Sequence, residues 1–256
     1  MLIDTHAHLD YPEFAPDFAE ILQRAAESDV TRIITIATGL ESSQRSLELA
    51  SKFPQISAVI GVHPNNVDEE PDDFQSSLRE MARTHRVAAI GETGLDYYRN
   101  ETDAQKARQA RFFRAQLEIA AEFHLNVVIH QRAAWDDTVA ILAEYGSRVR
   151  GVFHCFGEDL DRLRQVIDMG HLVSFTGIAT FKNGENMRAA ARVLQPGQFM
   201  VETDCPYLAP VPFRGKRCEP AHTRLVAETL AAARGESLET FAAHTTATAQ
   251  SFFQLD

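Results

Sequence analysis

The stretch MLIDTHAHLDYPEFAPDFAEILQRAAESDVTRIITIA, residues 1–37, contains two short apolar runs separated by an amphipathic segment. The runs at 1–6 and 32–37 are rich in Ile and Leu, as expected of strands that are buried on both faces. Between them, residues 17–28 place apolar side chains at helical spacing. The stretch therefore predicts a strand–helix–strand unit, the repeating element of parallel α/β folds.

The same alternation continues to the end of the chain. Further strands are predicted at 56–61, 87–91, 126–130, 151–155, 171–175 and 199–203. Helical patterns lie at 41–53, 72–85, 103–124, 134–146, 158–170, 184–194, 222–235 and 237–253. Strands alternating with helices over 256 residues predict an α/β fold, a single (β/α)8 TIM-type barrel domain covering residues 1–256. A doubly wound open sheet is the main alternative, because periodicity cannot show whether a sheet closes.

Composition indicates a soluble, folded protein: hydrophobic residues make up 45% and charged residues 24%. The formal net charge of −11 disfavours a non-enzymatic nucleic-acid-binding module, which needs a broad cationic surface. We find no signal-peptide pattern, no apolar run of about 18 residues and no sign of an obligate protein partner. Cys155, Cys205 and Cys218 lack CxxC spacing and are expected to be unpaired, which predicts a cytoplasmic protein away from membranes.

Histidines and carboxylates stand at the ends of five predicted strands. They are His6, His8, Glu92, His130, His154 and Asp204. In a (β/α)8 barrel the carboxyl ends of the strands lie at one face, so these side chains are expected to converge on a metal centre. Imidazole and carboxylate donors suit Zn²⁺ or Mn²⁺, and carboxylates with water suit Mg²⁺. Six ligands exceed the needs of one open site, so a pair of ions bridged by a carboxylate is the natural alternative.

Seven segments in sequence order carry a family resemblance. They are DTHAHLD (4–10), GVHPNNV (61–67), GETGLDYY (91–98), NVVIHQR (126–132), FHCFGEDL (153–160), VETDCPYLAP (201–210) and FRGKRCEPAH (213–222). Together they resemble the TatD family of metal-dependent deoxyribonucleases, within the amidohydrolase-like metallohydrolase superfamily of (β/α)8 barrels. Cys218 and His222 depart from the commonest pattern near the presumed substrate loop, which leaves substrate preference open.

The resemblance implies a role for each ligand. His6, His8 and Asp204 would surround one divalent ion and His130 and His154 the other, with Glu92 bridging both. Asp204 would also orient the attacking water or accept its proton, so Glu92 and Asp204 are the expected catalytic carboxylates. The implied activity is Mg²⁺-assisted hydrolysis of DNA, often as a 3′ to 5′ exonuclease on single strands, with Zn²⁺ or Mn²⁺ as possible metals.

Further residues are candidates for contact with the DNA. His63 is expected at the scissile phosphate or the leaving group, although local hydrogen bonding in a turn explains it equally well. Asp96 could orient ligands or be structural. The expected substrate-binding residues are Tyr97, Arg132, Arg214, Lys216 and Arg217.

An amidohydrolase that cleaves C–N or ester bonds of a small molecule is the alternative function, because fold and ligands are shared between the two classes. Such relatives often carry a carbamylated lysine at the end of strand five, where this chain has His130. A non-catalytic binding protein is disfavoured, because all six ligands are present.

Overall fold

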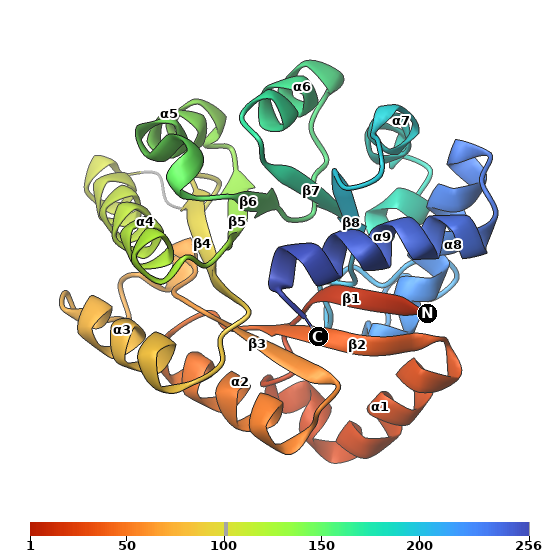
Figure 1. Cartoon of the computed structure of the whole chain (residues 1–256), viewed down its shortest axis with the longest axis horizontal. Coiled ribbons are helices and arrows are strands. Elements are labelled where there is room, and N and C mark those ends of the chain that lie inside the picture. Colours follow the sequence, from red (N-terminus) through yellow and green to blue (C-terminus); the bar gives the residue numbers. More distant parts are fainter. Residues whose placement is uncertain (100–101, 256) are drawn as a thin grey trace. The chain divides into compact units, whose positions relative to one another are not determined.

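The structure is a computed structural model that describes residues 1–99 and 102–255 (Figure 1). Its strands are β1 (Leu2–Ala7), β2 (Val30–Ile36), β3 (Ile56–Ile60), β4 (Ala89–Asp96), β5 (Val127–Arg132), β6 (Gly151–Phe153), β7 (Leu172–Phe175) and β8 (Phe199–Val201). The strand order in the sheet is the order in the chain, and the pairs are parallel. This topology, with a helix after each strand, confirms the predicted (β/α)8 TIM-type barrel.

The helices also follow the predicted pattern. They are α1 (Phe18–Glu27), α2 (Leu40–Lys52), α3 (Phe74–Thr84), α4 (Asp103–Phe123), α5 (Trp135–Tyr145), α6 (Leu160–Asp168), α7 (Glu185–Val193), α8 (Thr223–Arg234) and α9 (Leu238–Phe253). Short 3-10 helices are η1 (Pro12–Asp17), η2 (Pro64–Asn66), η3 (Gly146–Arg148), η4 (Gly177–Thr180) and η5 (Pro220–His222). In the described ranges, no helix is both long enough and apolar enough to cross a membrane.

The chain forms two compact units. Unit 1 comprises Met1–Thr35 and Cys155–Asp256, and unit 2 comprises Ile36–His154. The expectation of a single domain over residues 1–256 stays a prediction.

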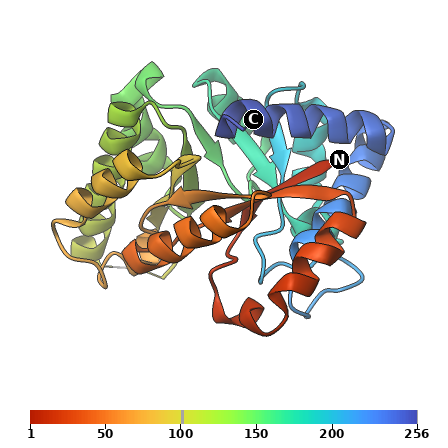
Figure 2. The same ribbon diagram turned by 60° about the horizontal axis from the view of Figure 1, so that its bottom comes forward.

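Unit 1 contains β7, β8, β1 and nearly all of β2. An isolated parallel bridge joins Ala7, the last residue of β1, to Cys205 in the loop that follows β8. α9 packs on β1 and β8, and α1 packs against η5 (Figures 1 and 2). The core includes Phe199 and Phe241, whose ring centroids lie 5.6 Å apart. Two distant parts of the sequence thus enclose one apolar core.

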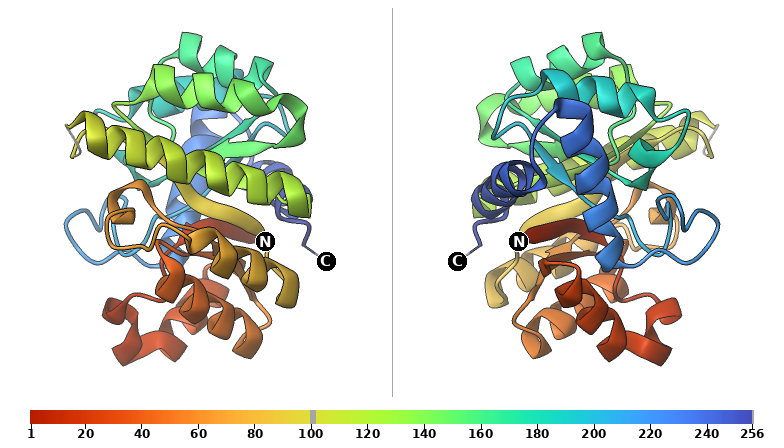
Figure 3. Two further views of the ribbon diagram at one scale, coloured as in Figure 1. Left: turned by 90° about the vertical axis from the view of Figure 1, so that its left-hand side faces the viewer. Right: turned by 90° about the vertical axis from the view of Figure 1, so that its right-hand side faces the viewer.

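Unit 2 contains β3 to β6, with α4 lying between α3 and α5 (Figure 3, left). The buried rings of Phe74 on α3 and Phe112 on α4 stack with centroids 4.1 Å apart. β4 is longer than its apolar run predicted, because its pairing with β5 continues to Asp96 opposite Arg132. Glu92 consequently lies inside this strand, in buried backbone, and does not follow it.

Candidate metal centre

Three histidines of unit 2 gather around the carboxylate of Glu92. His130 Nδ1 lies 2.7 Å and His154 Nε2 lies 2.8 Å from Glu92 Oε1. His63 Nε2 lies 3.6 Å from the same oxygen and 3.2 Å from His130 Nδ1. The side chain of Glu92 is only 3% exposed. The structure therefore brings these four residues, which we call the Glu92 cluster, together: Glu92 and His130 lie within β4 and β5, and His63 and His154 follow β3 and β6.

Asp96 fixes the orientation of the His130 ring. Its Oδ2 lies 3.2 Å from His130 Nε2 and accepts a hydrogen bond from the Asn65 amide at 3.0 Å. Burial raises the pKa of Asp96, but the hydrogen bonds from His130 and Asn65 outweigh it and lower the pKa to about 2. An ionised Asp96 keeps the proton of His130 on Nε2, so the lone pair of Nδ1 faces Glu92. This carboxylate–histidine arrangement is typical of imidazoles that bind metal ions.

Close packing of β4 on β5 depends on Gly94. Its φ is +141°, and a Cβ atom there would lie 2.0 Å from the carbonyl oxygen of His130. Only glycine allows this approach without displacing the backbone. The sequence GETG thus brings Glu92 and His130 within hydrogen-bond distance.

Unit 1 carries a second cluster, formed by His6, His8 and Asp204, which we call the Asp204 cluster. Nε2 of His6 lies 3.7 Å and Nε2 of His8 lies 3.4 Å from Asp204 Oδ1. The backbone N–H of Asp204 donates to the carbonyl of His6 at 2.8 Å, although Asp204 follows the last strand. The two histidines are buried and Asp204 is 15% exposed. The cluster thus offers two imidazoles and one accessible carboxylate.

Asp4 accepts hydrogen bonds from Thr203, the residue that precedes Asp204 in the chain. The hydroxyl of Thr203 donates to Asp4 Oδ2 at 2.6 Å, and the Thr203 backbone N–H donates to Oδ1 at 2.9 Å. Burial raises the pKa of Asp4 to about 8, although the hydrogen bonds from Thr203 oppose the shift. Asp4 thereby ties β1 to the residue that precedes Asp204. The sequence signal for this role, not used above, is a carboxylate inside the apolar run at residues 1–6.

The family model described as "TatD related DNase" matches residues 3–254. The chain belongs to the TatD-related DNase family. As a member of this family it is a metal-dependent hydrolase.

Relatives of the TatD family cover the whole chain. A protein of Escherichia coli K12 described as an uncharacterized metal-dependent hydrolase, YcfH, is 40% identical over 100% of this chain and 96% of its own length. The 3′-5′ ssDNA/RNA exonuclease TatD of Salmonella typhimurium is 30% identical over 99% of both chains. The crystal structure of the TatD homologue YJJV from E. coli has a TM-score of 0.93 and 28% identity, covering 100% of this chain and 98% of its own.

The TatD-family segment VETD also contains a residue that the sequence analysis overlooked. Glu202 is buried, and its Oε1 accepts the backbone N–H of Cys155 at 2.7 Å. Its Oε2 accepts the hydroxyl of Ser174 at 2.6 Å. Glu202 thus holds the peptide that directly follows His154 in the chain. Its spacing of two residues from Asp204, like that between His6 and His8, was the signal that could have revealed it.

The chemistry of the donors fits a divalent cation. Ligand atoms of His63, Glu92 and His130 all lie within 4.8 Å of one another. Imidazole nitrogens and carboxylate oxygens are the donors that Zn²⁺ and Mn²⁺ prefer, and carboxylates also serve Mg²⁺. The residues of the Glu92 cluster can therefore hold a metal ion, and the identity and number of ions belong to the proposal below.

The five expected substrate-binding residues lie in different surroundings. Arg132 ends β5 and is exposed. The hydroxyl of Tyr97 donates to Asp137 at 2.7 Å. In unit 1, Arg214 and Lys216 are exposed, whereas Arg217 binds both carboxylate oxygens of an aspartate in η1, Asp17, at 2.8 and 2.7 Å. Of the three basic side chains, Arg217 is thus already committed to an ion pair.

We expect Asp96→Asn to weaken divalent-metal binding by about tenfold to a hundredfold, the usual effect of losing a carboxylate that orients a histidine ligand. The amide presents an N–H₂ group where His130 and Asn65 now donate, so His130 loses its fixed orientation. Calorimetric titration with Mn²⁺ measures the affinity. Asp137→Asn, the same change at a carboxylate bound to Tyr97, is the matched control. Wild-type affinity in Asp96→Asn contradicts the orienting role.

Proposed function

We propose that this TatD-family hydrolase cleaves phosphodiester bonds in DNA, as a 3′ to 5′ exonuclease on single strands. The observation that carries the proposal is the buried Glu92 carboxylate with His130 and His154 at 2.7 and 2.8 Å, a donor set suited to the metals of phosphodiesterases. The Salmonella relative, named a 3′-5′ ssDNA/RNA exonuclease, supports the substrate and polarity. We also propose that the protein acts in the cytoplasm, because its three cysteines lack the spacing of a disulfide framework.

We assign the two clusters to two divalent ions, with Mg²⁺ as the activating metal. His6, His8 and Asp204 would hold one ion, His130 and His154 would hold the other, and Glu92 would serve both. Bound divalent ions supply positive charge that stabilises the phosphoryl oxygens in the transition state. This charge also lets a protein of net charge −11 accept a polyanion.

The residues of the chain carry the proton transfers in this scheme. Asp204, accessible and anchored by its backbone to His6, accepts the proton of the attacking water. His63 Nδ1 accepts the backbone N–H of Asn65 at 3.0 Å, so the proton of a neutral His63 ring resides on Nε2. Nε2 faces the Glu92 cluster, where it can donate to a phosphate or leaving-group oxygen.

The alternative of an amidohydrolase gains no specific support from the site. The residue at the position expected for a bridging lysine is His130, and its ring is held between Asp96 and Glu92. Small amides therefore serve as negative-control substrates in the assay.

The proposal is tested by offering single-stranded DNA, duplex DNA, RNA and small amides to the protein with Mg²⁺, Mn²⁺ or Zn²⁺. We expect metal-dependent release of nucleotides from the 3′ end of single-stranded DNA. Asp204→Asn should lower the single-turnover rate about a hundredfold or more while oligonucleotide affinity changes little. Hydrolysis of amides alone, or DNA cleavage that survives chelation of the metal, would overturn the proposal.

The exposed basic side chains of the loop after β8 generate a separate prediction. We expect the double change Arg214→Ala and Lys216→Ala to raise KM for single-stranded DNA roughly tenfold, because two phosphate contacts are lost. Each phosphate contact on a single strand contributes roughly 0.7 to the slope of log KM against log salt concentration. Loss of two contacts should therefore lower this slope by about 1.4. KM measured at several salt concentrations gives this slope.

Arg217→Ala is the matched control in the same loop. Its guanidinium is held by Asp17 and the carbonyl of Glu13, so its loss should affect thermal stability more than the salt slope. An unchanged slope in the double variant would remove Arg214 and Lys216 from the DNA-binding surface.

A further inference from the structure

An exposed aromatic ring lies just beyond β4, beside the last residue of β5. The guanidinium carbon of Arg132 lies 3.9 Å from the ring centroid of Tyr98. Tyr98 is 62% exposed, among the most exposed large apolar side chains of the described residues. A stacked pair leaves much of the ring and guanidinium in contact with solvent, where both present flat surfaces.

This pair is attached to the Glu92 cluster through one carboxylate. The backbone N–H of Tyr98 donates to Asp96 Oδ1 at 3.0 Å, while Asp96 Oδ2 lies 3.2 Å from His130 Nε2. The carbonyl of Arg132 accepts the backbone N–H of Tyr97 at 2.9 Å. The turn that carries Tyr98 is therefore held by the same group that orients His130.

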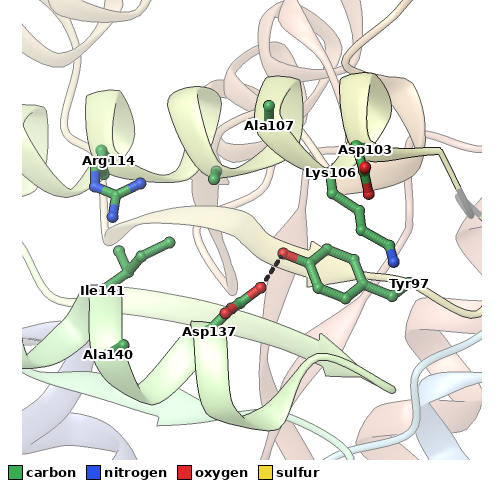
Figure 4. A pocket seen from close by; sticks show the side chains of 9 residues that line it. Tyr97, Asp103, Lys106, Ala107, Arg114, Asp137, Ala140 and Ile141 are labelled. Atoms are coloured by element: carbon green, nitrogen blue, oxygen red, sulfur yellow. Dashed lines mark hydrogen bonds between the residues drawn. The ribbon is translucent and has the colours of Figure 1, made fainter.

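Tyr97, the tyrosine that the sequence predicts as a substrate-binding residue, has different surroundings from Tyr98. It lines a hollow of about 380 Å³ between α4 and α5, with its hydroxyl pointing at Asp137 (Figure 4). The Lys106 ammonium lies 5.0 Å from its ring centroid. Burial, followed by the bond to Asp137, raises the pKa of Tyr97 well above its usual range. Its ring is thus engaged by helix side chains.

We propose that Tyr98 and Arg132 form a stacking subsite for an unpaired nucleobase of the substrate. This inference rests on the proposed function and deepens it, because it names the group that recognises the base next to the cluster. Aromatic rings and guanidinium planes stack on any base, so the subsite selects for single strands without selecting sequence. A base within a duplex is already stacked on its neighbours and cannot use this platform.

Stacking also explains how a strongly acidic protein can gain affinity for DNA. The protein carries a net charge of −11, so long-range attraction of DNA is unfavourable outside the metal centre and the loop after β8. Contact between a base and an exposed ring adds affinity that does not depend on net charge. Binding through this subsite is accordingly less sensitive to salt than binding through phosphates.

The test compares Tyr98→Ala with Tyr98→Phe on two substrates: a normal oligonucleotide and one with abasic sugars at its 3′ end. We expect Tyr98→Ala to raise KM about tenfold on the normal substrate, with kcat changed less than about threefold. Tyr98→Phe should restore the wild-type KM, because the ring is what stacks. On the abasic substrate, Tyr98→Ala should match the wild type.

Two results would overturn the subsite. One is an unchanged KM for Tyr98→Ala on the normal substrate, and the other is an equal rise on both substrates, which a merely structural role of Tyr98 would produce. Thermal unfolding of each variant shows whether Tyr98→Ala has a folding defect. If it does, Arg132→Lys, which keeps the charge but loses the planar group, is compared on the same two substrates instead. A wild-type protein that cleaves no nucleic acid would overturn the proposed function together with the subsite.

Discussion

The buried carboxylate of Glu92 is the constraint on which the candidate centre depends. A carboxylate only 3% exposed is costly in a protein interior unless hydrogen bonds or opposite charge compensate it. In unit 2 the ring nitrogens of His130 and His154 lie 2.7 and 2.8 Å from Glu92 Oε1, and with its proton on Nε2 the His130 ring presents the lone pair of Nδ1 to this oxygen. A bound cation is the natural counter-charge for such a group of acceptors. Glu92 lies in the part of β4 that extends past its apolar run, where Gly94 allows close packing on β5.

Within each unit, further carboxylates hold the candidate ligands or their neighbours in the chain. Asp96 orients the ring of His130, and Asp4 ties β1 to the residue before Asp204. Glu202 holds the peptide next to His154. Each of these groups lies within two residues of a candidate ligand or in contact with one. Changes in these carboxylates should therefore alter metal affinity while leaving the ligands themselves in place.

The sequence predicted the elements well and their side-chain contacts poorly. Apolar runs and helical spacing located the strands and helices, because burial imposes those periods directly. The resemblance and the predicted strands singled out His130 and Glu92 as candidates, although Glu92 lies inside β4 and does not follow it. The sequence could not predict that Tyr98, and not Tyr97, is the more exposed ring. Alternation of side chains predicts orientation only within a strand, and β4 ends at Asp96.

Long-range ion pairs are the other part that sequence patterns miss. Arg217 reads as one of three equivalent basic residues in FRGKR, yet it binds Asp17, which is 200 residues away in the chain. Its neighbours Arg214 and Lys216 have no ion pair among the residues that the structure describes. The difference depends on the packing of η1 in unit 1, which no local pattern records.

Glu92 lies at the centre of the proposed metal chemistry, and the metal content of the protein tests this role most directly. Wild-type protein and Glu92→Gln should be dialysed against Mn²⁺ and the bound metal counted by emission spectroscopy, with DNA turnover measured in parallel. The substitution keeps the shape and removes one negative charge. We expect about two ions per wild-type chain, at most one in the variant, and turnover lowered roughly a hundredfold or more. Full metal content with wild-type turnover in Glu92→Gln would contradict the account.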